Sequence, residues 1–240
     1  ILAAPADWNV LTQGNVSNFE VLGAATIGTY DFSKLSGGVA VLSADVTDNG
    51  GSVVFSNMPS SSTGTIINTE GMDLLLAQDS ASDDATITIS TPVTAGITVA
   101  DSIGLTEYET VTINSSGVSD NSIDIDSGQM TSLVVAGSQG ITVTITDATT
   151  LKTIDGSGIQ DAAGTGLTVD GNPSVAAAGG VTITGTDYGL DNLLGGAGGD
   201  TISGGGVADS LSGAGGADTL NGGGGNDLII GGAGIDTLNG

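Results

Sequence analysis

The stretch that decides the fold runs from Gly195 to Asn239 and reads GGAGGDTIS GGGVADSLS GAGGADTLN GGGGNDLII GGAGIDTLN when it is divided into nines. A degenerate copy, TDYGLDNLL, occupies Thr186 to Leu194 just before it. The sixth residue of every copy is Asp, and the eighth is Leu or Ile. This strict spacing predicts a repeating structure in which each copy places a carboxylate and an apolar side chain in the same way. The aspartates are Asp191, Asp200, Asp209, Asp218, Asp227 and Asp236.

The repeats lack the side chains for an ordinary hydrophobic core. Glycine supplies 20 of the last 56 residues, and ordering a glycine backbone costs more conformational entropy than ordering any other. Carboxylates stacked in successive coils, about 4.8 Å apart, would also repel one another. Without a cation we therefore expect this segment to be disordered.

Calcium would remove both defects. Ca²⁺ takes about six to eight oxygen ligands, backbone carbonyls included, in flexible geometry. With two nonapeptides per coil, alternate aspartates would line the two edges of a parallel β-roll, and successive loops on one edge would share an ion. The predicted ligands are the six aspartates and the carbonyls of the first and third residues of each repeat. These residues are Gly195, Ala197, Gly204, Gly206, Gly213, Gly215, Gly222, Gly224, Gly231 and Ala233.

Three departures from the repeat fall at particular sites. Val207 replaces Gly at the fourth position of the second full copy, and Ala214 replaces Gly at the second position of the third. The degenerate first copy contains Asp187 and Tyr188. These changes affect the sites that contain Asp191 and Asp209.

The pattern G-G-x-G-x-D-x-U-x resembles the calcium-binding nonapeptide of the repeats-in-toxin (RTX) proteins. This resemblance implies that Ca²⁺ is the bound ion. The alternative is a disordered glycine-rich acidic linker. Five near-contiguous copies with an invariant Asp and an invariant apolar eighth residue favour calcium binding.

Upstream of the repeats, short runs alternate Thr with Ile or Val, as in ITVTITD from Ile141 to Asp147. This alternation is typical of half-buried strands rich in β-branched residues. Runs recur about every ten to fifteen residues, a rhythm that fits either a β-sandwich or a β-solenoid, and the β-roll that follows favours the solenoid. The best candidate for a long loop is Asn57 to Thr65. The runs are 85–90, 110–114, 122–127 and 141–147, with weaker ones near Leu75, Val99, Val134, Ile154, Val169 and Ile183.

We therefore expect an all-β chain with three parts. Residues 1–60 form an irregular β-rich part or a solenoid cap, and residues 61–184 form a Thr-rich β-solenoid of β-helix-like character. Residues 185–240 form the calcium-binding parallel β-roll. The repeat stops at Gly240, and the start lacks an initiating Met and a basic segment. We accordingly expect a piece of a longer polypeptide whose export signal lies elsewhere.

The composition excludes several classes of partner. The chain has 27 acidic residues against two Lys, with no Arg and no His, and a formal charge of −25. Phosphate contacts need Lys and Arg, so neither nucleic acid nor an anionic membrane surface is an expected partner. No apolar run approaches the roughly 20 residues that cross a bilayer. The absence of Cys excludes disulfides.

The sequence also lacks catalytic equipment, and we predict no enzyme and no catalytic residue. Without His there is neither an HExxH zinc site nor a His base for a serine hydrolase, and without Arg a pectate-lyase-type site is not expected. A carboxylate pair, as in polysaccharide hydrolysis, stays open. Sugar-binding adhesins usually expose aromatic residues, yet only Tyr108 and Tyr188 follow Phe55.

Further acidic residues upstream could form additional calcium sites. The densest clusters, SDDA and DNSIDID, do not match an EF-hand loop. We expect them to be solvated turns. These acids are Asp79, Asp83, Asp84, Asp101, Asp120, Asp124, Asp126, Asp147 and Asp155.

The order of segments resembles the calcium-dependent surface-layer (S-layer) proteins of Gram-negative bacteria. The similar segments are VSNFEVLGAATIGTYDFSKLSG (16–37), EYETVTINSS (107–116), MTSLVVAGSQGITVTIT (130–146), LKTIDGSG (151–158) and VTITGTDYGLDNLLGGAGGD (181–200).

That resemblance implies a secreted structural protein that leaves the cell by type I secretion and folds outside it in calcium. It would assemble with copies of itself into a surface lattice or filament. Cell-surface polysaccharide would be contacted through parts that lie outside this chain. The alternative is an RTX-bearing segment of a type I secreted adhesin, or of a secreted hydrolase whose catalytic unit lies elsewhere.

Overall fold

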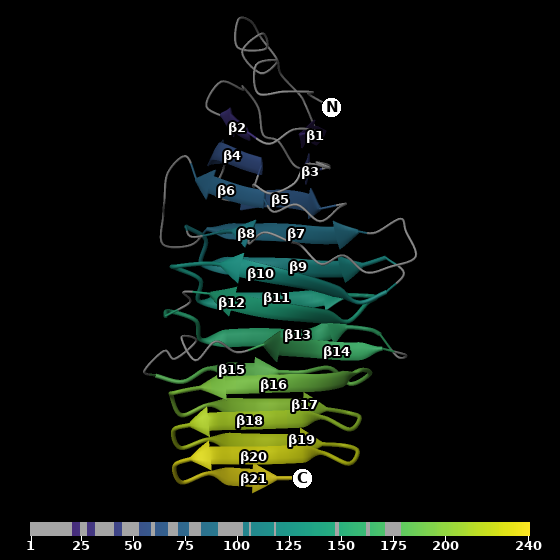
Figure 1. Cartoon of the computed structure of the whole chain (residues 1–240), viewed down its shortest axis with the longest axis vertical. Coiled ribbons are helices and arrows are strands. Elements are labelled where there is room, and N and C mark those ends of the chain that lie inside the picture. Colours follow the sequence, from purple (N-terminus) through teal and green to yellow (C-terminus); the bar gives the residue numbers. More distant parts are fainter. Residues whose placement is uncertain are drawn as a thin grey trace, which may run out of the picture.

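In the computed structural model the chain winds into a solenoid whose strands alternate between two parallel sheets (Figure 1). The structure describes the backbone of the strands at 21–24, 28–31, 41–44, 53–58, 61–66 and 72–76. It also describes residues 83–90, 103–105, 107–117, 119–146, 149–161, 164–170 and 179–240. The described residues contain no helix that is long and apolar enough to cross a membrane.

The odd-numbered strands form an 11-stranded sheet, called the odd sheet below, and the even-numbered strands form a 10-stranded even sheet. The odd sheet contains β1 (Val21–Ala24), β3 (Val41–Ala44), β5 (Ser61–Ile66), β7 (Asp84–Ser90), β9 (Thr110–Ser116), β11 (Ser132–Gly137), β13 (Thr153–Ile159), β15 (Thr182–Thr184), β17 (Thr201–Gly205), β19 (Thr219–Gly223) and β21 (Thr237–Asn239). The even sheet contains β2 (Gly28–Asp31), β4 (Val53–Met58), β6 (Met72–Leu76), β8 (Ile103–Gly104), β10 (Asn121–Asp126), β12 (Ile141–Thr146), β14 (Thr165–Asp170), β16 (Leu190–Gly196), β18 (Ser210–Gly215) and β20 (Leu228–Ala233).

Every strand pairs in parallel with the strand two places along the chain, as β9 does with β11 and β10 with β12. A β-sandwich is built from antiparallel sheets, so the parallel pairing excludes that alternative. The predicted all-β class, with a β-solenoid leading into a parallel β-roll, is confirmed.

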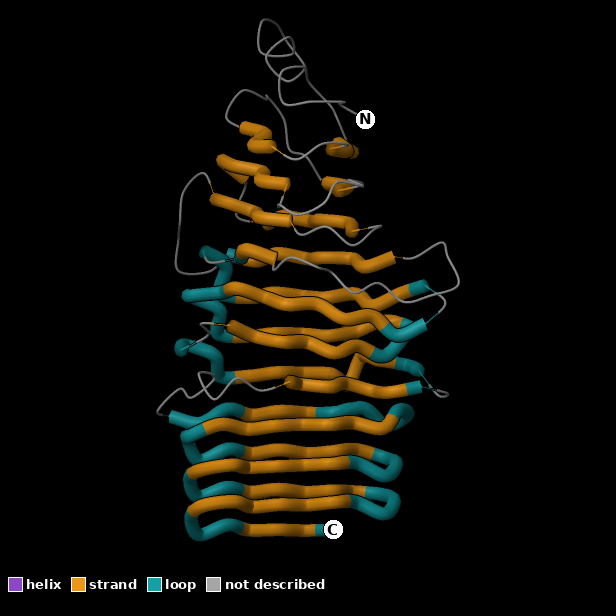
Figure 2. The backbone as a smooth tube through the Cα atoms, in the orientation of Figure 1, coloured by secondary structure: helices purple, strands orange, loops and turns teal. Residues whose placement is uncertain are grey.

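Coil length separates the two regions of the solenoid. In the repeats Thr201 pairs with Thr219 and Thr219 with Thr237, so one coil takes 18 residues, or two nonapeptides. Upstream the spacing is irregular, with 19 residues between Val53 and Met72 and 31 between Asp73 and Gly104. Figure 2 accordingly shows nearly identical outlines for the C-terminal coils.

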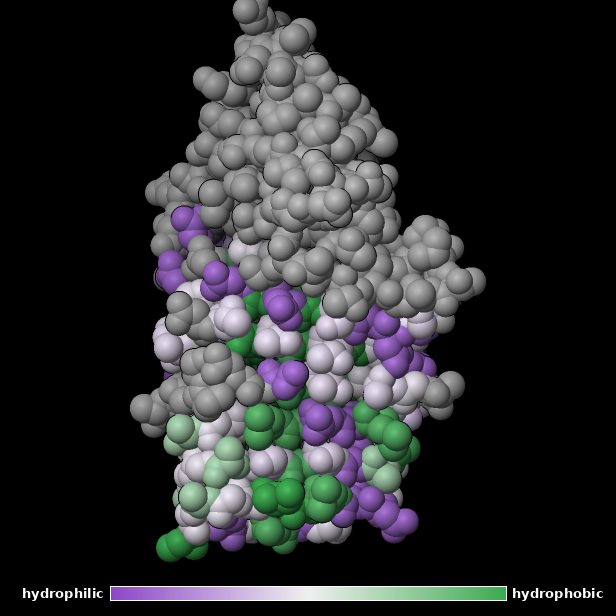
Figure 3. All heavy atoms as spheres, viewed as in Figure 1, coloured by the Kyte–Doolittle hydropathy of each residue, from purple (hydrophilic) through white to green (hydrophobic). Residues whose placement is uncertain are grey.

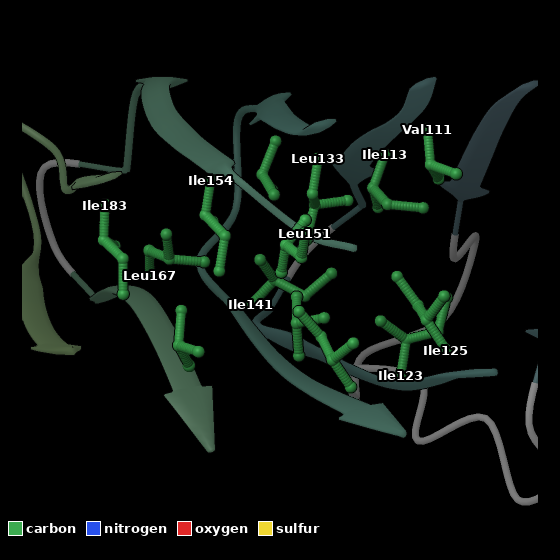
Figure 4. Packing of buried hydrophobic residues seen from close by; sticks show 14 of the residues in the cluster. Val111, Ile113, Ile123, Ile125, Leu133, Ile141, Leu151, Ile154, Leu167 and Ile183 are labelled. Carbon is green, nitrogen blue, oxygen red and sulfur yellow. The ribbon is translucent and has the colours of Figure 1, made fainter. Parts of the chain in front are cut away.

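The interior is a column of apolar side chains contributed by both sheets. In β12 the burial alternates residue by residue, so Ile141, Val143 and Ile145 point inward and the Thr residues between them outward. Figure 4 shows side chains from the two sheets, Val111 and Ile125 among them, directed toward each other. This packing is the consequence of the Thr/Ile alternation in the sequence.

One local prediction is wrong. The segment 57–65 is not a long loop, because β4 extends to Met58 and β5 begins at Ser61. The backbone of β5 pairs in register with β7, and Thr63 matches Thr86. A Ser/Thr-rich segment can form a strand where a neighbouring coil supplies the hydrogen-bonding edge, since Thr is β-branched. The predicted run near Val99 lies outside the described residues.

The division of the chain at residues 60 and 184 stays a prediction. Both sheets continue through these positions without a break in strand order.

Candidate calcium-binding site

The repeat aspartates lie at the two edges where one sheet passes into the other. Each edge carries one carboxylate per coil. On one edge lie Asp191, Asp209 and Asp227, at the N-terminal ends of β16, β18 and β20. On the other edge lie Asp200, Asp218 and Asp236, directly before β17, β19 and β21.

One oxygen of each carboxylate links its coil to the coil before it. The N–H of Asp191 donates to Oδ1 of Asp209 at 2.9 Å, and the N–H of Asp200 donates to Oδ1 of Asp218 at 2.8 Å. The same bond recurs one coil further on, at 3.0 Å on both edges. Hydrogen bonds to a carboxylate are stronger than neutral ones. These hydrogen bonds join the aspartates of successive coils into a row along each edge, called the aspartate ladder below. Each bond uses only one oxygen of the accepting carboxylate.

The second oxygen, Oδ2, has a donor in the first two members of the ladder. Oδ2 of Asp191 accepts the N–H of Thr186 at 2.6 Å. Oδ2 of Asp200 accepts the N–H of Gly196 at 2.8 Å. Oδ1 of Asp191 accepts the N–H of Leu167, and Oδ1 of Asp200 accepts the N–H of Val181, so both carboxylate oxygens of these two side chains are occupied by backbone donors.

The next two members of the ladder differ. Oδ2 of Asp209 and Oδ2 of Asp218 are buried and have no hydrogen-bond partner among the described residues. The side chains are only 4% and 1% exposed. A buried carboxylate oxygen without a partner lowers the stability of the folded state, because the charge loses its hydration and no hydrogen bond or ion pair replaces it. A cation at this oxygen would supply the missing interaction.

The first glycine of each repeat lies against this second oxygen. A Cβ added to Gly204 would lie 2.4 Å from Oδ2 of Asp209 and 2.7 Å from the carbonyl oxygen of Gly222, one coil further on. Any larger residue would therefore fill the space between a carboxylate and a carbonyl. The corresponding distances to Oδ2 are between 2.1 and 2.4 Å for Gly195, Gly213, Gly222 and Gly231.

The third residues of the repeats lie in the turns and stack along the same edges. A Cβ on Gly224 would lie 3.2 Å from the carbonyl oxygen of Gly206, and a Cβ on Gly206 would lie 2.6 Å from that of Asp187. The backbone at each of these glycines thus lies close to a carbonyl group of the preceding coil. Their assignment as ligands, with the first residues and the aspartates, stays a prediction.

The second residues give these turns their shape. Gly205, Gly223 and Gly232 have φ of 137°, 97° and 103°, values in the left-handed region that glycine adopts without strain. Ala214 occupies the equivalent position with φ 70° and is the only described non-glycine residue with positive φ. Every full copy after the first therefore keeps a left-handed residue at this position, even where the sequence departs from the repeat.

The donor set fits calcium. The described residues contain no group of three or more His, Cys, Asp or Glu side chains placed to enclose a metal, and the chain has no His or Cys. Ligands beyond one carboxylate per repeat would therefore come from main-chain carbonyls. Ca²⁺ accepts such oxygens in flexible geometry, whereas Mg²⁺ demands near-octahedral geometry and Zn²⁺ favours N and S ligands.

Burial makes these carboxylates poor acids. Desolvation raises the pKa of Asp191 to about 7 from an ordinary value of 3.8, although the N–H groups of Thr186 and Leu167 counteract the shift. The pKa values of Asp200 and Asp209 are raised for the same reason, and the carboxylate in the next coil adds to both shifts. A bound Ca²⁺ would oppose this effect by favouring the charged form.

We predict opposite pH dependence with and without calcium. A raised pKa means that the folded roll binds a proton more tightly than the unfolded chain. In calcium-free buffer this stabilisation is complete below about pH 3.8 and is lost as the pH rises through about 7. With calcium, protons compete with the ion, so the calcium concentration at half-folding should rise as the pH falls below 7.

Circular dichroism in metal-stripped buffer, and calcium titrations at several pH values, would test this. Asp191→Asn cannot titrate but replaces one of two acceptor oxygens by an NH2 group, so it is compared with the wild type by its pH dependence and not by its absolute stability. If the calcium concentration at half-folding of the wild type did not rise between pH 8 and pH 5, the assigned pKa shift would be wrong.

The prediction of solvated turns is wrong for several upstream acids, because Asp84 lies on β7, Asp124 and Asp126 on β10, and Asp155 on β13. Oδ1 of Asp155 accepts the N–H of Ser157 at 3.0 Å, and Oδ2 of Asp120 accepts from the hydroxyl of Thr165. Asp124 and Asp126 lie half-buried on the outer face of β10. Asp79, Asp101 and Asp147 lie outside the described residues.

The structure also shows an upstream equivalent of the aspartate ladder that the sequence did not reveal. Asp83 and Glu109 directly precede the register-matched residues Asp84 and Thr110, as Asp200 precedes Thr201. The N–H of Asp83 donates to Oε2 of Glu109 at 2.8 Å, the same link that joins the repeat aspartates. The 26-residue spacing hides this relation from a search for nonapeptides.

A parallel roll with one buried carboxylate per nonapeptide at its corners defines a calcium-binding β-roll. Residues 185–206 and 204–238 match the model of the RTX calcium-binding nonapeptide repeat, which contains four copies. No curated protein and no solved structure matches the chain significantly. The C-terminal segment is thus an RTX calcium-binding β-roll, and RTX nonapeptide repeats bind Ca²⁺. The predicted RTX repeats and their ion are confirmed for this segment.

The RTX β-roll is a structural calcium-binding motif rather than a catalytic one. Proteins that carry it are typically exported by type I secretion and are extracellular.

Proposed function

We propose that this chain is part of a calcium-dependent structural protein that assembles with copies of itself on a bacterial surface, as an S-layer-like lattice or filament. Its ions would be held at the roll edges by the six aspartates and by the carbonyls of the first and third residues of each repeat. In the low calcium of the cytosol the roll would remain unfolded and could pass through a type I exporter. Outside the cell, calcium would fold it.

The observation that carries the assembly proposal is an apolar row on the outer face of β20. Leu228 and Ile230 flank the inward-facing Ile229 and are 58% and 51% exposed. Leu190 and Tyr188, near β16, are 54% and 52% exposed. Figure 3 shows apolar side chains gathered toward the C-terminal end of the described surface.

Exposed apolar patches on a soluble protein mark contact sites. A chain of charge −25 would otherwise repel its own copies. Calcium held at the roll edges lowers this repulsion, so assembly through the apolar row would depend on the same ion that folds the roll.

The test is electron microscopy of the purified chain with millimolar calcium and with a chelator. We expect ordered sheets or filaments only with calcium. The double variant Leu228→Ser/Ile230→Ser should abolish them while leaving calcium-induced folding intact. Serine is chosen because Ser210 pairs with Leu228 and Ser212 with Ile230 in the neighbouring strand β18.

The matched control is Thr219→Ser/Asn221→Ser, which changes the same two repeat positions on the odd sheet and should assemble normally. Monodisperse wild-type particles in both conditions would contradict the proposal and favour an RTX-bearing segment of an adhesin or hydrolase. A double variant that assembles like the wild type would show that the apolar row is not the contact.

A further inference from the structure

The outer face of the odd sheet carries a continuous row of hydroxyl side chains. Each strand of this sheet from β9 to β21 contributes one Thr or Ser, and each of these pairs in register with the member on the next strand. Neighbouring strands lie about 4.8 Å apart, so a hydroxyl recurs at this interval along the face. The members of the row are Thr110, Ser132, Thr153, Thr182, Thr201, Thr219 and Thr237.

A second row of small polar side chains runs beside the first in the strands from β15 to β21. It lies two residues further along each strand, which places it about 6.6 Å from the first row. The residue between the rows is apolar and points inward, as Ile183 and Ile202 do. These strands therefore present a two-dimensional polar array. The polar array consists of Thr182 and Thr184 on β15, Thr201 and Ser203 on β17, Thr219 and Asn221 on β19, and Thr237 and Asn239 on β21.

The polar array is regular because the coils beneath it are regular. From β17 to β21 every coil has the same length, and Figure 2 shows these coils stacked with nearly identical outlines. In Figure 1 the strands β15, β17, β19 and β21 follow one another along the solenoid axis. Thr is β-branched, which restricts rotation about χ1. Its hydroxyls are therefore positioned before a ligand arrives, and such preorganisation lowers the entropic cost of binding.

The first row of the polar array is open to solvent. All four of its Thr side chains are exposed. A hydroxyl group has one donor and two acceptor lone pairs, so each of these side chains can donate to one ligand group and accept from another. The row can thus form a line of equivalent hydrogen bonds.

The polar array carries no charge, although the chain has a formal charge of −25. The repeat aspartates that precede β17 and β19 lie buried in the roll edge, where Asp200 and Asp218 are only 2% and 1% exposed. Upstream, Val134 and Asp155 interrupt the second row, so the regular part of the face is confined to β15–β21. Binding surfaces are electrostatically complementary to their ligands. An uncharged face on a strongly acidic chain therefore suits a neutral ligand.

The spacing of the polar array restricts the ligand further. A single hydrogen bond contributes only about 0.5–1.5 kcal/mol, so many equal bonds must form at once. A flexible ligand would lose entropy on being ordered over the array, whereas a solid whose hydrogen-bonding groups repeat at similar intervals in two directions would not. Ice is such a solid, because its oxygen atoms form a fixed lattice of donors and acceptors. Crystalline polysaccharide is another, but sugar rings usually stack on aromatic side chains, and the polar array contains none.

We propose that the polar array binds ice. Its hydroxyl and amide groups take the place of water molecules at the ice surface, and the Thr methyl groups between them present apolar surface around which water is ordered. Because the array lies on strands of the roll, ice binding requires the folded roll and hence calcium. It does not require assembly through the apolar row of β20.

Slow freezing of the whole chain in millimolar calcium tests this proposal. The wild type should become enriched in the growing ice and should lower the freezing point of the solution below its melting point. Thr201→Lys places a long charged side chain in the middle of the first row and should lose most of both effects. Asn192→Lys is the matched control, because Asn192 is also exposed and holds the same repeat position on the even sheet. It should behave as the wild type does, and both variants should keep the circular dichroism of the folded roll.

Several results would overturn the proposal. They are a wild-type chain that stays in the liquid fraction, full ice binding by Thr201→Lys, and an equal loss in both variants. Binding to crystalline cellulose or chitin without enrichment in ice would make a neutral polysaccharide the ligand instead. Self-association without ice binding, abolished by Thr201→Lys, would make the array a contact between copies.

The same freezing experiment on Leu228→Ser/Ile230→Ser separates this proposal from the proposed assembly. These two side chains lie on the even sheet, away from the polar array. Ice binding should persist in this variant, although it should no longer assemble. Loss of ice binding together with assembly would show that the polar array does not act on its own, and this would also overturn the proposal.

Discussion

Removal of calcium is expected to unfold β18–β21 while β9–β14 keep their amide protection. The two parts of one continuous solenoid should separate in this way because their interiors differ. Ile113, Val135 and Val143 belong to a continuous cluster of buried apolar side chains to which both sheets contribute. The roll instead buries carboxylates such as Asp209 and Asp218, and each has a buried oxygen without a hydrogen-bond partner, which a cation would satisfy.

The size of this loss of stability follows from the thermodynamic linkage between calcium binding and folding. A ligand that binds only the folded state at about 100 times its Kd contributes about 2.7 kcal/mol per site. Several sites in one short roll would together contribute a free energy comparable with the usual stability of a small domain, about 5–15 kcal/mol. Withdrawal of the ion should therefore cause complete unfolding of these coils rather than loosening.

Hydrogen exchange in chelator, compared with millimolar calcium, would measure this region by region. Magnesium at the same concentration is the control and should restore little protection, because it requires tighter octahedral coordination. Equal protection of β18–β21 in chelator and in calcium would show that the roll is held together by something other than the ion.

Much of the fold was predictable because its signals are periodic. The Thr/Ile alternation at 141–147 matches β12, and SLVVAG matches β11 residue for residue. The invariant Asp and the apolar eighth residue likewise predict two edges and one inward column per sheet. In each case the sequence period equals a structural period, so no tertiary information was needed.

Other features depend on contacts between distant residues. Asp83 and Glu109 are joined only because a 26-residue coil closes between them. The segment 57–65 becomes strand because β7 supplies an edge for it. The orphaned oxygens of Asp209 and Asp218 differ from those of Asp191 and Asp200 only through the backbone donors nearby. An aspartate that recurs at the same repeat position therefore does not reveal, from the sequence alone, which of its oxygens has a hydrogen-bond donor.

A single methyl group at Gly213 should remove one calcium site. A Cβ at this position would lie 2.2 Å from Oδ2 of Asp218 and 2.6 Å from the carbonyl oxygen of Gly231. Gly213 does not have a left-handed φ, so alanine is not excluded by backbone conformation. The effect of Gly213→Ala would come from steric displacement of two oxygens that face the proposed ion.

Overpacking of this kind costs about 1–3 kcal/mol, which corresponds to a roughly 5- to 150-fold loss of affinity. Isothermal titration calorimetry should show one site weakened or lost in Gly213→Ala, with the remaining sites retained. Gly179→Ala is the matched control, because a Cβ there meets nothing within 4 Å, and its titration should equal that of the wild type. Unchanged stoichiometry and affinity in Gly213→Ala would mean that calcium is bound away from the space between this glycine and Asp218, and the proposed ligand set would have to be abandoned.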